Sequence, residues 1–499
     1  MPFESLAAFL DKIAFRYGDT PVAHTADGNQ LTYAEWCRRS RSIAAALAGI
    51  GVQRGCTVAL AFTQTTWLEY LVTYVATLRL GATVASLPSG RTPQELRALA
   101  SMAAASLIVS AGVSDFGETT ASYSSLASRP GTWTGGGEVG PDDCAEVLFT
   151  SGSTGNPKPV WCSHADLANT LPYEGVGRDV RLAGFYPIGS NAAQGIVQQM
   201  LQPEPYWHGR LEVWNIDIFH PKTFLQLIER HHVNALRLTP TLAALLNEEL
   251  ALHPGLYNVS SISWIKLSSS YSSPKLLSQI KEQFPDAEII NFYGSTEGGR
   301  ACLRMIYGID DPASLGRAAP GTEVEIRDAD GLPVAPGDIG EIWLRAVGQR
   351  SSRAPDTLGK VAADVWVTSG DLGYIDELGS VYLFGRLKDV INVAGTKVSP
   401  ISIEEAFRSH SGISAVAAFP VPDPVLGEAV GVAVVPTKGD YTVTVTPTEL
   451  MSFAASRLQP AELPITILLL EELPMTSAGK VDKRTLADMA DATEPGSTA

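Results

Sequence analysis

The sequence contains few cysteines, and they form no familiar pairing pattern. The five cysteines among 499 residues are Cys37, Cys56, Cys144, Cys162 and Cys302. Their odd number, their wide spacing and the lack of any Cys-x-x-Cys pair argue against a disulfide framework and against a zinc site. A reducing compartment suits such a chain, and we expect the protein to be cytoplasmic.

The chain also lacks an excess of positive charge. It carries 37 Lys and Arg residues against 53 Asp and Glu residues, a formal net charge of −16, and its basic residues are scattered along the sequence. Binding to a nucleic-acid backbone requires a basic face. We therefore expect no nucleic-acid partner.

No long hydrophobic run is free of interruption. The most apolar stretch, "LVTYVATLRLGATVASL", is broken by Arg79 and Gly81, so it predicts a buried helix running into a strand and no membrane span. The N-terminal stretch "MPFESLAAFLDKIAFRYG" carries Glu4 and Asp11 among apolar residues at helical spacing. That pattern predicts an amphipathic helix and not a signal peptide.

What is present is the composition of a folded protein with two or more domains, since 45% of 499 residues are hydrophobic and 18% are charged. Helices alternating with short apolar runs, up to about residue 293, predict a large N-terminal domain of layered α/β sheets. Residues 316–383 change to short strands between Gly and Pro turns, which predicts an antiparallel sheet or a small β-barrel-like region. The segment after Arg386 predicts a small α+β domain, so we divide the chain into domains 1–386 and 387–499.

One loop invites a functional interpretation. Residues 149–161 read "FTSGSTGNPKPVW", with hydroxyl side chains, two glycines and Lys158 between apolar, β-prone flanks. A plain surface turn has the same composition. The alternative is an anion cradle made of backbone N–H groups, hydroxyls and an ammonium group, for which phosphate is the natural ligand. It is not a Walker A loop, because it joins two strands; the next helix begins later, with Ser163 as its N-cap and Asp166 in a capping box.

Two further motifs place polar groups where strands end or turn. In "NFYGSTEGG", residues 291–299, Tyr293 offers a ring to stack on a base, Thr296 a hydroxyl for phosphate and Glu297 an oxygen ligand for magnesium. The alternative is a strand-to-turn transition with a solvated glutamate. In "WVTSGDLGYID", Asp371 either forms a turn or accepts both hydroxyls of a ribose.

Two basic motifs follow in the C-terminal part of the chain. "GRLKD" holds Arg386 and Lys388 at the predicted domain boundary, where a hinge would also lie. "LPMTSAGKVDK" holds Lys480 in a Gly-Lys loop. Taken alone, each of these basic residues is most simply a solvated surface charge.

The five motifs in this order and at this spacing resemble the adenylate-forming, or acyl-activating, superfamily, and most closely a free-standing acyl- or aryl-CoA synthetase of the AMP-forming type. The resemblance runs from "LTYAEW" at Leu31 to about Arg484. It implies that a carboxylic acid is joined to ATP with release of pyrophosphate and that the acyl group then passes from the adenylate to a thiol. ATP, Mg²⁺ and coenzyme A are the implied cofactor and substrates.

The resemblance also implies residue roles. Lys480, Thr296 and Glu297 would be catalytic, with Glu297 binding Mg²⁺ and Lys480 bridging the carboxylate and the α-phosphate. The residues implied to bind ATP and AMP are Thr150, Ser151, Gly152, Ser153, Thr154, Gly155, Lys158, Ser270, Tyr271, Asn291, Tyr293, Gly294, Ser295, Asp371 and Arg386. Rotation of a mobile C-terminal domain about Lys388 would replace Lys480 by the loop holding Gly395 and Lys397, which would line the thiol tunnel. Ser190, Asn191, Tyr271 and Gly298 would line the acyl pocket.

Coenzyme A is the expected thiol, because no carrier-protein domain follows Lys480. A stand-alone ligase that loads a separate acyl carrier protein is the near alternative. A luciferase-like oxygenase and an ATP-binding protein without catalysis are more distant ones.

Three departures from the family pattern concern the site. Pro159 stands where the phosphate loop usually has glycine, and "SSSYSSP" at residues 268–274 replaces a glycine-rich loop. Ser190 falls where many members carry a His or aromatic gate. No aspartate stands where amino-acid-activating members hold the substrate ammonium, so we expect a non-amino-acid substrate, which could be an aromatic, medium-chain or bulky polycyclic acid.

Overall fold

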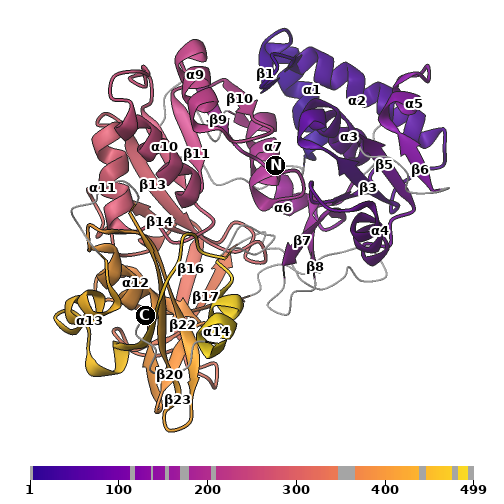
Figure 1. Cartoon of the computed structure of the whole chain (residues 1–499). Coiled ribbons are helices and arrows are strands. Elements are labelled where there is room, and N and C mark those ends of the chain that lie inside the picture. The colour runs from indigo at the N-terminus through magenta and orange to yellow at the C-terminus, as the bar shows by residue number, and fades with distance from the viewer. Residues whose placement is uncertain are drawn as a thin grey trace. The chain divides into compact units, whose positions relative to one another are not determined.

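The computed structural model describes residues 4–112, 119–135, 139–151, 157–168, 179–203, 209–346, 366–437, 445–474 and 481–492. The chain forms two compact units (Figure 1). The first contains Met1–Val324 and Leu344–Val367, and the second contains Glu325–Trp343 and Thr368–Ala499.

The first unit is built on two sheets, of which the larger has nine strands. Its strands, in spatial order, are β15 (Arg317–Ala318), β14 (Leu303–Ile306), β13 (Glu288–Tyr293), β12 (Trp264–Leu267), β11 (Ala235–Leu238), β9 (Val180–Gly184), β10 (Leu211–Asn215), β1 (Pro21–Thr25) and β2 (Gln30–Thr32). The strands from β13 to β1 run parallel, and the strands outside them pair antiparallel. The carboxyl ends of the central strands therefore share one edge of the sheet, where α/β proteins place ligands.

The second sheet of this unit has six strands. They are, in order, β6 (Thr120–Ser122), β5 (Leu107–Ala111), β3 (Thr57–Phe62), β4 (Thr83–Ser86), β7 (Cys144–Ser151) and β8 (Pro157–Ser163). All neighbours are parallel except β7 and β8, which form an antiparallel pair at the edge.

Helices cover both sheets and share one core between them. The helices of this unit are α1 (Leu6–Tyr17), α2 (Tyr33–Ala48), α3 (Trp67–Arg79), α4 (Pro93–Met102), α5 (Tyr123–Ala127), α6 (His164–Ala168), α7 (Asn191–Leu201), α9 (Pro221–His231), α10 (Pro240–Leu252) and α11 (Pro274–Gln283), with the 3₁₀ turn η1 (Gln64–Thr66). Helices α1, α2, α3 and α7 contribute to a cluster that includes strands of both sheets. Helices α9, α10 and α11 pack on the other face of the nine-stranded sheet, and α4 packs on the six-stranded one.

Local sequence explains where several helices begin. Thr32 with Glu35 and Thr92 with Glu95 form capping boxes at α2 and α4. Proline occupies the first turn of α9, α10 and α11, where its missing N–H costs no hydrogen bond.

The second unit contains one five-stranded sheet and most of a four-stranded sheet. The strands are β16 (Thr322–Arg327), β17 (Gly340–Ala346), β18 (Val367–Ile375) and β19 (Val381–Arg386) in the smaller sheet, and β21 (Thr396–Val398), β20 (Ile391–Val393), β23 (Gly427–Pro436), β22 (Ile413–Asp423) and β24 (Pro464–Leu469) in the larger. The helical segments are α12 (Pro400–Arg408), α13 (Pro447–Ala455), α14 (Lys483–Ala492) and the 3₁₀ turn η2 (Pro460–Glu462). A core cluster joins the larger sheet to α12 and α13, and a smaller one joins it to α14.

The predicted fold class is confirmed, with one correction. The large α/β part and the smaller α+β part are both present. The β-barrel-like region is instead an open four-stranded sheet within the part of the chain that the structure describes, and β15 belongs to the nine-stranded sheet. Four short strands are too few to close around a core.

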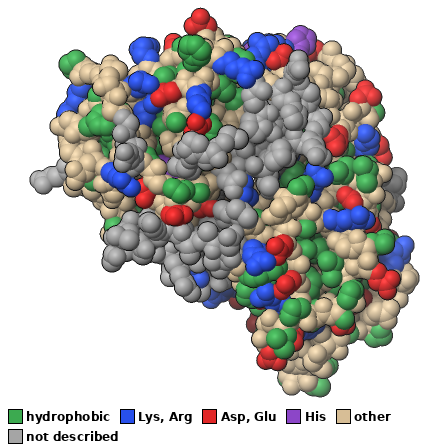
Figure 2. Space-filling view, turned by 180° about the vertical axis from the view of Figure 1, so that it is seen from behind, with side chains coloured by type: hydrophobic (Ala, Val, Ile, Leu, Met, Phe, Trp, Pro, Cys, Tyr) green, Lys and Arg blue, Asp and Glu red, His purple; other side chains and the backbone are tan. Residues whose placement is uncertain are grey.

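No helix among the described segments is both long and apolar enough to cross a bilayer. The predicted amphipathic helix is α1. The predicted helix running into a strand is α3 followed by β4; every residue of α3 except Glu69 is buried, and β4 is fully buried. On the face drawn in Figure 2, side chains of both charge signs are interspersed.

Candidate active site

The predicted phosphate loop joins β7 to β8, as its apolar flanks predicted. Thr150 pairs in register with Lys158, whose side chain is exposed, and the buried Thr150 hydroxyl has no hydrogen-bond partner in the described part of the chain. Gly152, Ser153, Thr154 and Gly155 lie outside the described residues, as does the side chain of Ser151. The two ends of the loop are therefore held together by the β7–β8 ladder.

Pro159 is accommodated because it lies on an edge strand. It belongs to β8, the last strand of the six-stranded sheet, and pairs with Phe149 of β7. Proline lacks an N–H donor, and edge strands tolerate that loss. The helix after β8 begins as predicted: the Asp166 carboxylate accepts from the Ser163 N–H at 2.7 Å, and the Ser163 hydroxyl accepts from the Asp166 N–H at 3.1 Å.

The "NFYGSTEGG" segment leaves the nine-stranded sheet at the carboxyl end of β13. Asn291 and Tyr293 belong to the strand, and Gly294, Ser295, Thr296 and Glu297 follow it directly. The Ser295 hydroxyl accepts from the Gly298 N–H at 3.0 Å, which holds the turn after the strand. Thr296 and Glu297 are partly buried, and Gly298 is buried.

The serine-rich loop leaves the adjacent strand, β12, at the same edge. Its Ser272 hydroxyl is buried and donates to the Asn291 Oδ1 at 3.2 Å, so the structure brings this loop and the β13 motif together. Ser269 has a φ of +85°, a conformation that favours glycine. Such backbone strain occurs preferentially at functional sites. Ser270 is exposed and Tyr271 is partly buried.

Ser190 and Asn191 lie at the start of α7. The Ser190 hydroxyl accepts from the Ala193 N–H at 3.1 Å and so caps the helix, while Asn191 is exposed. The segment before the helix follows β9, at the same edge of the sheet as the two motifs above.

In the second unit, Asp371 and Arg386 are opposite each other on β18 and β19. Their side chains form an ion pair, with Arg386 Nε 3.2 Å from Asp371 Oδ1. Asp371 is 7% exposed and its N–H donates to the Ser369 hydroxyl at 3.1 Å. Asp371 thus lies inside a strand and not only in a turn.

The remaining predicted residues of the second unit are exposed. Lys388 lies in the turn after β19, where the Asp389 N–H donates to the Arg386 carbonyl at 2.9 Å. Gly395 has a φ of +88° in the turn between β20 and β21, and Lys397 lies on β21. The role of Lys388 as a hinge and that of the Gly395 loop stay predictions.

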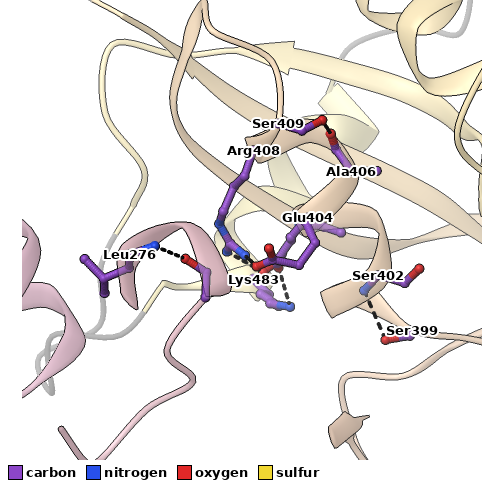
Figure 3. A network of polar contacts seen from close by, with 11 residues as sticks. Leu276, Ser399, Ser402, Glu404, Ala406, Arg408, Ser409 and Lys483 are labelled. Atoms are coloured by element: carbon purple, nitrogen blue, oxygen red, sulfur yellow. Dashed lines mark hydrogen bonds and ion pairs between the residues drawn. The ribbon is translucent and has the colours of Figure 1, made fainter. Parts of the chain in front are cut away.

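Lys480 lies outside the described residues, but both ends of its segment are fixed. The Asp482 N–H donates to the Pro474 carbonyl at 2.8 Å. Figure 3 shows Lys483 and Arg408 directed at Glu404 of α12, with the Lys483 Nζ 3.3 Å and the Arg408 Nη2 2.9 Å from its carboxylate oxygens. These contacts hold the start of α14 against α12.

Sequence reasoning did not single out three charged residues of the first unit that are buried or partly buried. Glu146 lies in β7, Arg237 in β11 and Lys266 in β12; Glu146 is 0% exposed, Lys266 is 8% exposed, and Arg237 is partly buried with a buried Nη1. The available signal was a charged letter inside the apolar runs "CAEVLF", "ALRL" and "WIKL". A charged residue is rarely buried without a partner or a function.

Two family matches cover most of the chain. The AMP-binding enzyme family matches residues 4–349, and the AMP-binding enzyme C-terminal domain matches residues 402–480.

Among curated proteins, the chain is 25% identical over 525 aligned residues to an oxalate–CoA ligase of Arabidopsis thaliana, covering 98% of this chain and 99% of that protein. It is 28% identical over 494 residues to a feruloyl-CoA synthase of an Amycolatopsis species, covering 93% and 94%. It is 32% identical over 368 residues to a long-chain-fatty-acid–CoA ligase of Bacillus subtilis, covering 69% and 62%.

Solved structures share the fold. ATP-bound MatB from Rhodopseudomonas palustris matches with a TM-score of 0.82 at 24% identity, over 97% of this chain and 98% of that one. The anthranilate CoA ligase AuaEII in complex with anthranoyl-AMP matches with a TM-score of 0.82 at 19% identity, over 98% of each chain.

Proposed function

Because this chain belongs to the AMP-binding enzyme family, we propose that it is an AMP-forming acid–CoA ligase. A carboxylate oxygen of the acid attacks the α-phosphorus of ATP, the bond to pyrophosphate breaks, and an acyl-adenylate forms. The sulfur of coenzyme A then attacks the acyl carbon, AMP leaves with the electron pair of the broken bond, and the thiol proton is released. The observation that carries this proposal is the match of both family domains, in order, within one chain.

The first step brings two anions together, so catalysis depends on positioning and on positive charge at the phosphates. In our proposal the β7–β8 loop holds the β- and γ-phosphates through Thr150, Lys158 and residues 151–155. The pairing of Thr150 with Lys158 supports this, because it places a buried, unpartnered hydroxyl and an exposed ammonium on neighbouring strands at the mouth of the loop.

Mg²⁺ fits the donor chemistry at the end of β13. Glu297 offers a carboxylate beside the Thr296 hydroxyl, and hard oxygen donors are what Mg²⁺ prefers. No group of three or more potential metal-binding side chains occurs within the described ranges, so Glu297 would hold the ion together with phosphate oxygens of the nucleotide. When bound, Mg²⁺ neutralises charge that develops on those oxygens.

Adenosine roles are proposed for Tyr293 and Asp371. Tyr293 would stack on adenine from the end of β13, and the buried Asp371 carboxylate would accept from the ribose hydroxyls. The ion pair with Arg386 supports this role, because it orients the carboxylate.

Lys480 would bridge the attacking carboxylate and the α-phosphate. Its segment ends at a hydrogen bond between residues 474 and 482 and at the Lys483–Glu404 ion pair, so the loop is tethered to the second unit. Rotation of the predicted domain 387–499 about Lys388 would remove Lys480 and bring the Gly395 and Lys397 loop to the thiol path. The boundary between domains 1–386 and 387–499 belongs to the same proposal.

The relatives' names span oxalate, ferulate and long fatty acids, so they do not select the acid. Acid-dependent pyrophosphate release, screened over aromatic, medium-chain and polycyclic acids with coenzyme A present, tests the function. A preference for amino acids would overturn the substrate class. Mass spectrometry of the thiol product separates coenzyme A from a carrier protein, and oxygen uptake without a thiol would indicate an oxygenase.

Lys480→Ala separates the two half-reactions. We expect adenylation to fall by roughly 100- to 1000-fold, since one stabilising charge is lost from the transition state. Thioester formation from a supplied acyl-adenylate should stay within about threefold of wild type. Lys222→Ala, an exposed lysine of α9, is the matched control. An equal loss in both half-reactions would contradict the two-conformation mechanism.

A further inference from the structure

The Gln64 side chain connects the two sheets of the first unit. Gln64 lies in η1, two residues after the end of β3 in the six-stranded sheet. Its Nε2 donates to the Tyr186 carbonyl at 2.8 Å, and its Oε1 accepts from the Ile188 N–H at 3.2 Å. Tyr186 and Ile188 belong to the segment that follows β9 of the nine-stranded sheet. An amide from one sheet therefore holds the backbone that leaves the other.

Asn215, the last residue of β10, completes this contact. Its Oδ1 accepts from the Tyr186 N–H at 3.0 Å and from the Gln64 Nε2 at 3.1 Å, and its Nδ2 donates to the Tyr186 carbonyl at 3.3 Å. Asn215 is 3% exposed and Tyr186 is 1% exposed. Buried backbone groups that leave a strand require new partners. The two amide side chains supply them for Tyr186.

The loop after β4 holds the same segment from a second direction. The Ser89 N–H donates to the Ile188 carbonyl at 3.1 Å. Gly189 has a φ of +81°, and a Cβ added to it would lie 2.6 Å from the Pro88 nitrogen. Only glycine allows this backbone contact without strain. Residues 186–190 are therefore held in one conformation by groups of both sheets.

The chain diverges at this point of the nine-stranded sheet. After β9 it enters α7, on the face that shares a core with the six-stranded sheet, and after the adjacent strand β11 it enters α10, on the opposite face. Open α/β sheets bind ligands outside the carboxyl ends of their strands, where the connections of neighbouring strands diverge in this way. Residues 186–190 are the connection on the β9 side. They would form one wall of such a site.

The wall is separate from the residues proposed to hold adenosine in this unit. Tyr293 ends β13, and β13 lies three strands from β9 in the sheet, which corresponds to about 14 Å. The hydrogen bonds of Gln64 reach residues 186, 188, 215 and 216. A change at Gln64 should therefore affect the acid more than ATP.

We propose that Gln64, acting with Asn215, is a positioning residue for the acid substrate. It fixes residues 186–190 as a preformed wall of the acid site and so sets which acids fit, without touching the acid itself. This inference rests on the proposed function, since it assumes that the acid binds at the carboxyl edge of the nine-stranded sheet. The simpler alternative is a contact that only stabilises the fold.

The first test measures the kinetics of Gln64→Met, which keeps the length of the side chain and removes its donors and acceptor. Acid-dependent pyrophosphate release would be followed with benzoate, ferulate, octanoate and cholate, and with the best acid of the wider screen. We expect kcat/KM for the preferred acid to fall by about 10- to 100-fold, mainly through KM, because the wall is displaced. KM for ATP should change by less than about threefold, and the preference among the acids should narrow.

Gln202→Met is the matched control. The Gln202 Nε2 donates to the Leu167 carbonyl at 3.4 Å from the other end of α7, about 17 Å from its start. This variant also loses a side-chain bond to the backbone, but KM for the acid should stay within about threefold of wild type. An equal rise of the acid KM in both variants would indicate a structural role and overturn the inference. So would a rise of the acid KM and the ATP KM together in Gln64→Met.

A milder variant keeps the inference testable if Gln64→Met does not fold. Gln64→Asn retains an amide on a shorter side chain that cannot reach Tyr186, Ile188 and Asn215 together, so the acid KM should rise by about three- to tenfold. An unchanged acid KM in a folded Gln64 variant would overturn the inference and leave the proposed function standing. No release from the wild type with any acid would count against the proposed function itself.

Discussion

Two buried charged clusters of the first unit are held in opposite ways. The Glu146 carboxylate, on β7, accepts from the Tyr74 phenol at 2.9 Å, from the Ser86 hydroxyl at 2.8 Å and from the Gln194 amide. Ser86 is itself within hydrogen-bond distance of the Tyr70 phenol, at 3.0 Å. This anion is enclosed by donors.

The Arg237–Lys266 pair, in contrast, combines two like charges and a guanidinium nitrogen without a partner in the described chain. The two clusters meet the same helix, since Gln194 and Gly195 are consecutive residues of α7 and a Cβ added at Gly195 would lie 3.9 Å from the Arg237 Nη2. A buried charge with a full set of hydrogen bonds stabilises the fold, whereas the buried Arg237 Nη1 has no hydrogen-bond partner among the described residues. The contrast predicts that removing the charge changes the free energy of unfolding in opposite directions at the two clusters.

The largest effect is expected on the Glu146 side. Glu146→Ala would leave the Tyr74, Ser86 and Gln194 donors buried without their acceptor, which should lower the free energy of unfolding by about 3–5 kcal/mol. Urea unfolding of the acid-free protein measures this change. Glu229→Ala, at an exposed position of α9, should change it by less than about 0.5 kcal/mol. A loss below about 1 kcal/mol for Glu146→Ala would break the comparison, because the network would then not be structural.

On the other side, Lys266→Met should stabilise the acid-free protein by about 1 kcal/mol, since it removes a buried amine whose protonation is opposed by burial and by Arg237, and keeps the volume. The thioether can also contact the Phe292 ring, whose centroid lies 3.9 Å from the Lys266 Nζ. Lys281→Met is the informative control, because the Lys281 ammonium donates to the Ala287 carbonyl at 2.9 Å and its loss should destabilise. A destabilised Lys266→Met would show that this lysine supports the fold instead.

The sequence anticipated what local pattern determines. The β7–β8 pair followed from apolar runs on both sides of "SGSTGNPKP", and the start of α6 followed from Ser163 and Asp166. The edge position of β8, which makes Pro159 harmless, depends on strand order and so could not be read from the sequence. The open sheet taken for a barrel has the same cause, because short strands and turns do not reveal whether the edges pair.

The interior position of these charged residues could not be predicted from the sequence for a related reason. In "ALRL" and "WIKL", Arg237 and Lys266 each stand between two apolar residues, as a solvent-facing residue of a half-exposed strand can. Only the packing of α7 on that face makes them interior. The ion pair of Asp371 and Arg386 likewise needed the register of β18 and β19, although each residue had been singled out by its motif.

The smallest expected effect is the pH dependence that Lys266 gives to the free energy of unfolding. The folded protein holds the pKa of Lys266 well below its usual value, chiefly by burial and next by Arg237. Between that lowered pKa and the unfolded value of about 10.4, the unfolded chain carries the extra proton, so wild-type stability rises with pH in this window.

We expect the free energy of unfolding of wild type to lie below that of Lys266→Met. This difference should therefore shrink as pH rises from about 6 to 9, by at most about 1.4 kcal/mol per pH unit. Arg237, Cys302 and Tyr186, which also face this position, are present in both proteins, so the difference isolates Lys266. Urea unfolding across this pH range measures it. A difference that is constant or grows with pH would show that Lys266 keeps its proton in the folded protein without a ligand, and the distinction between the two buried clusters would then lie in Arg237 alone.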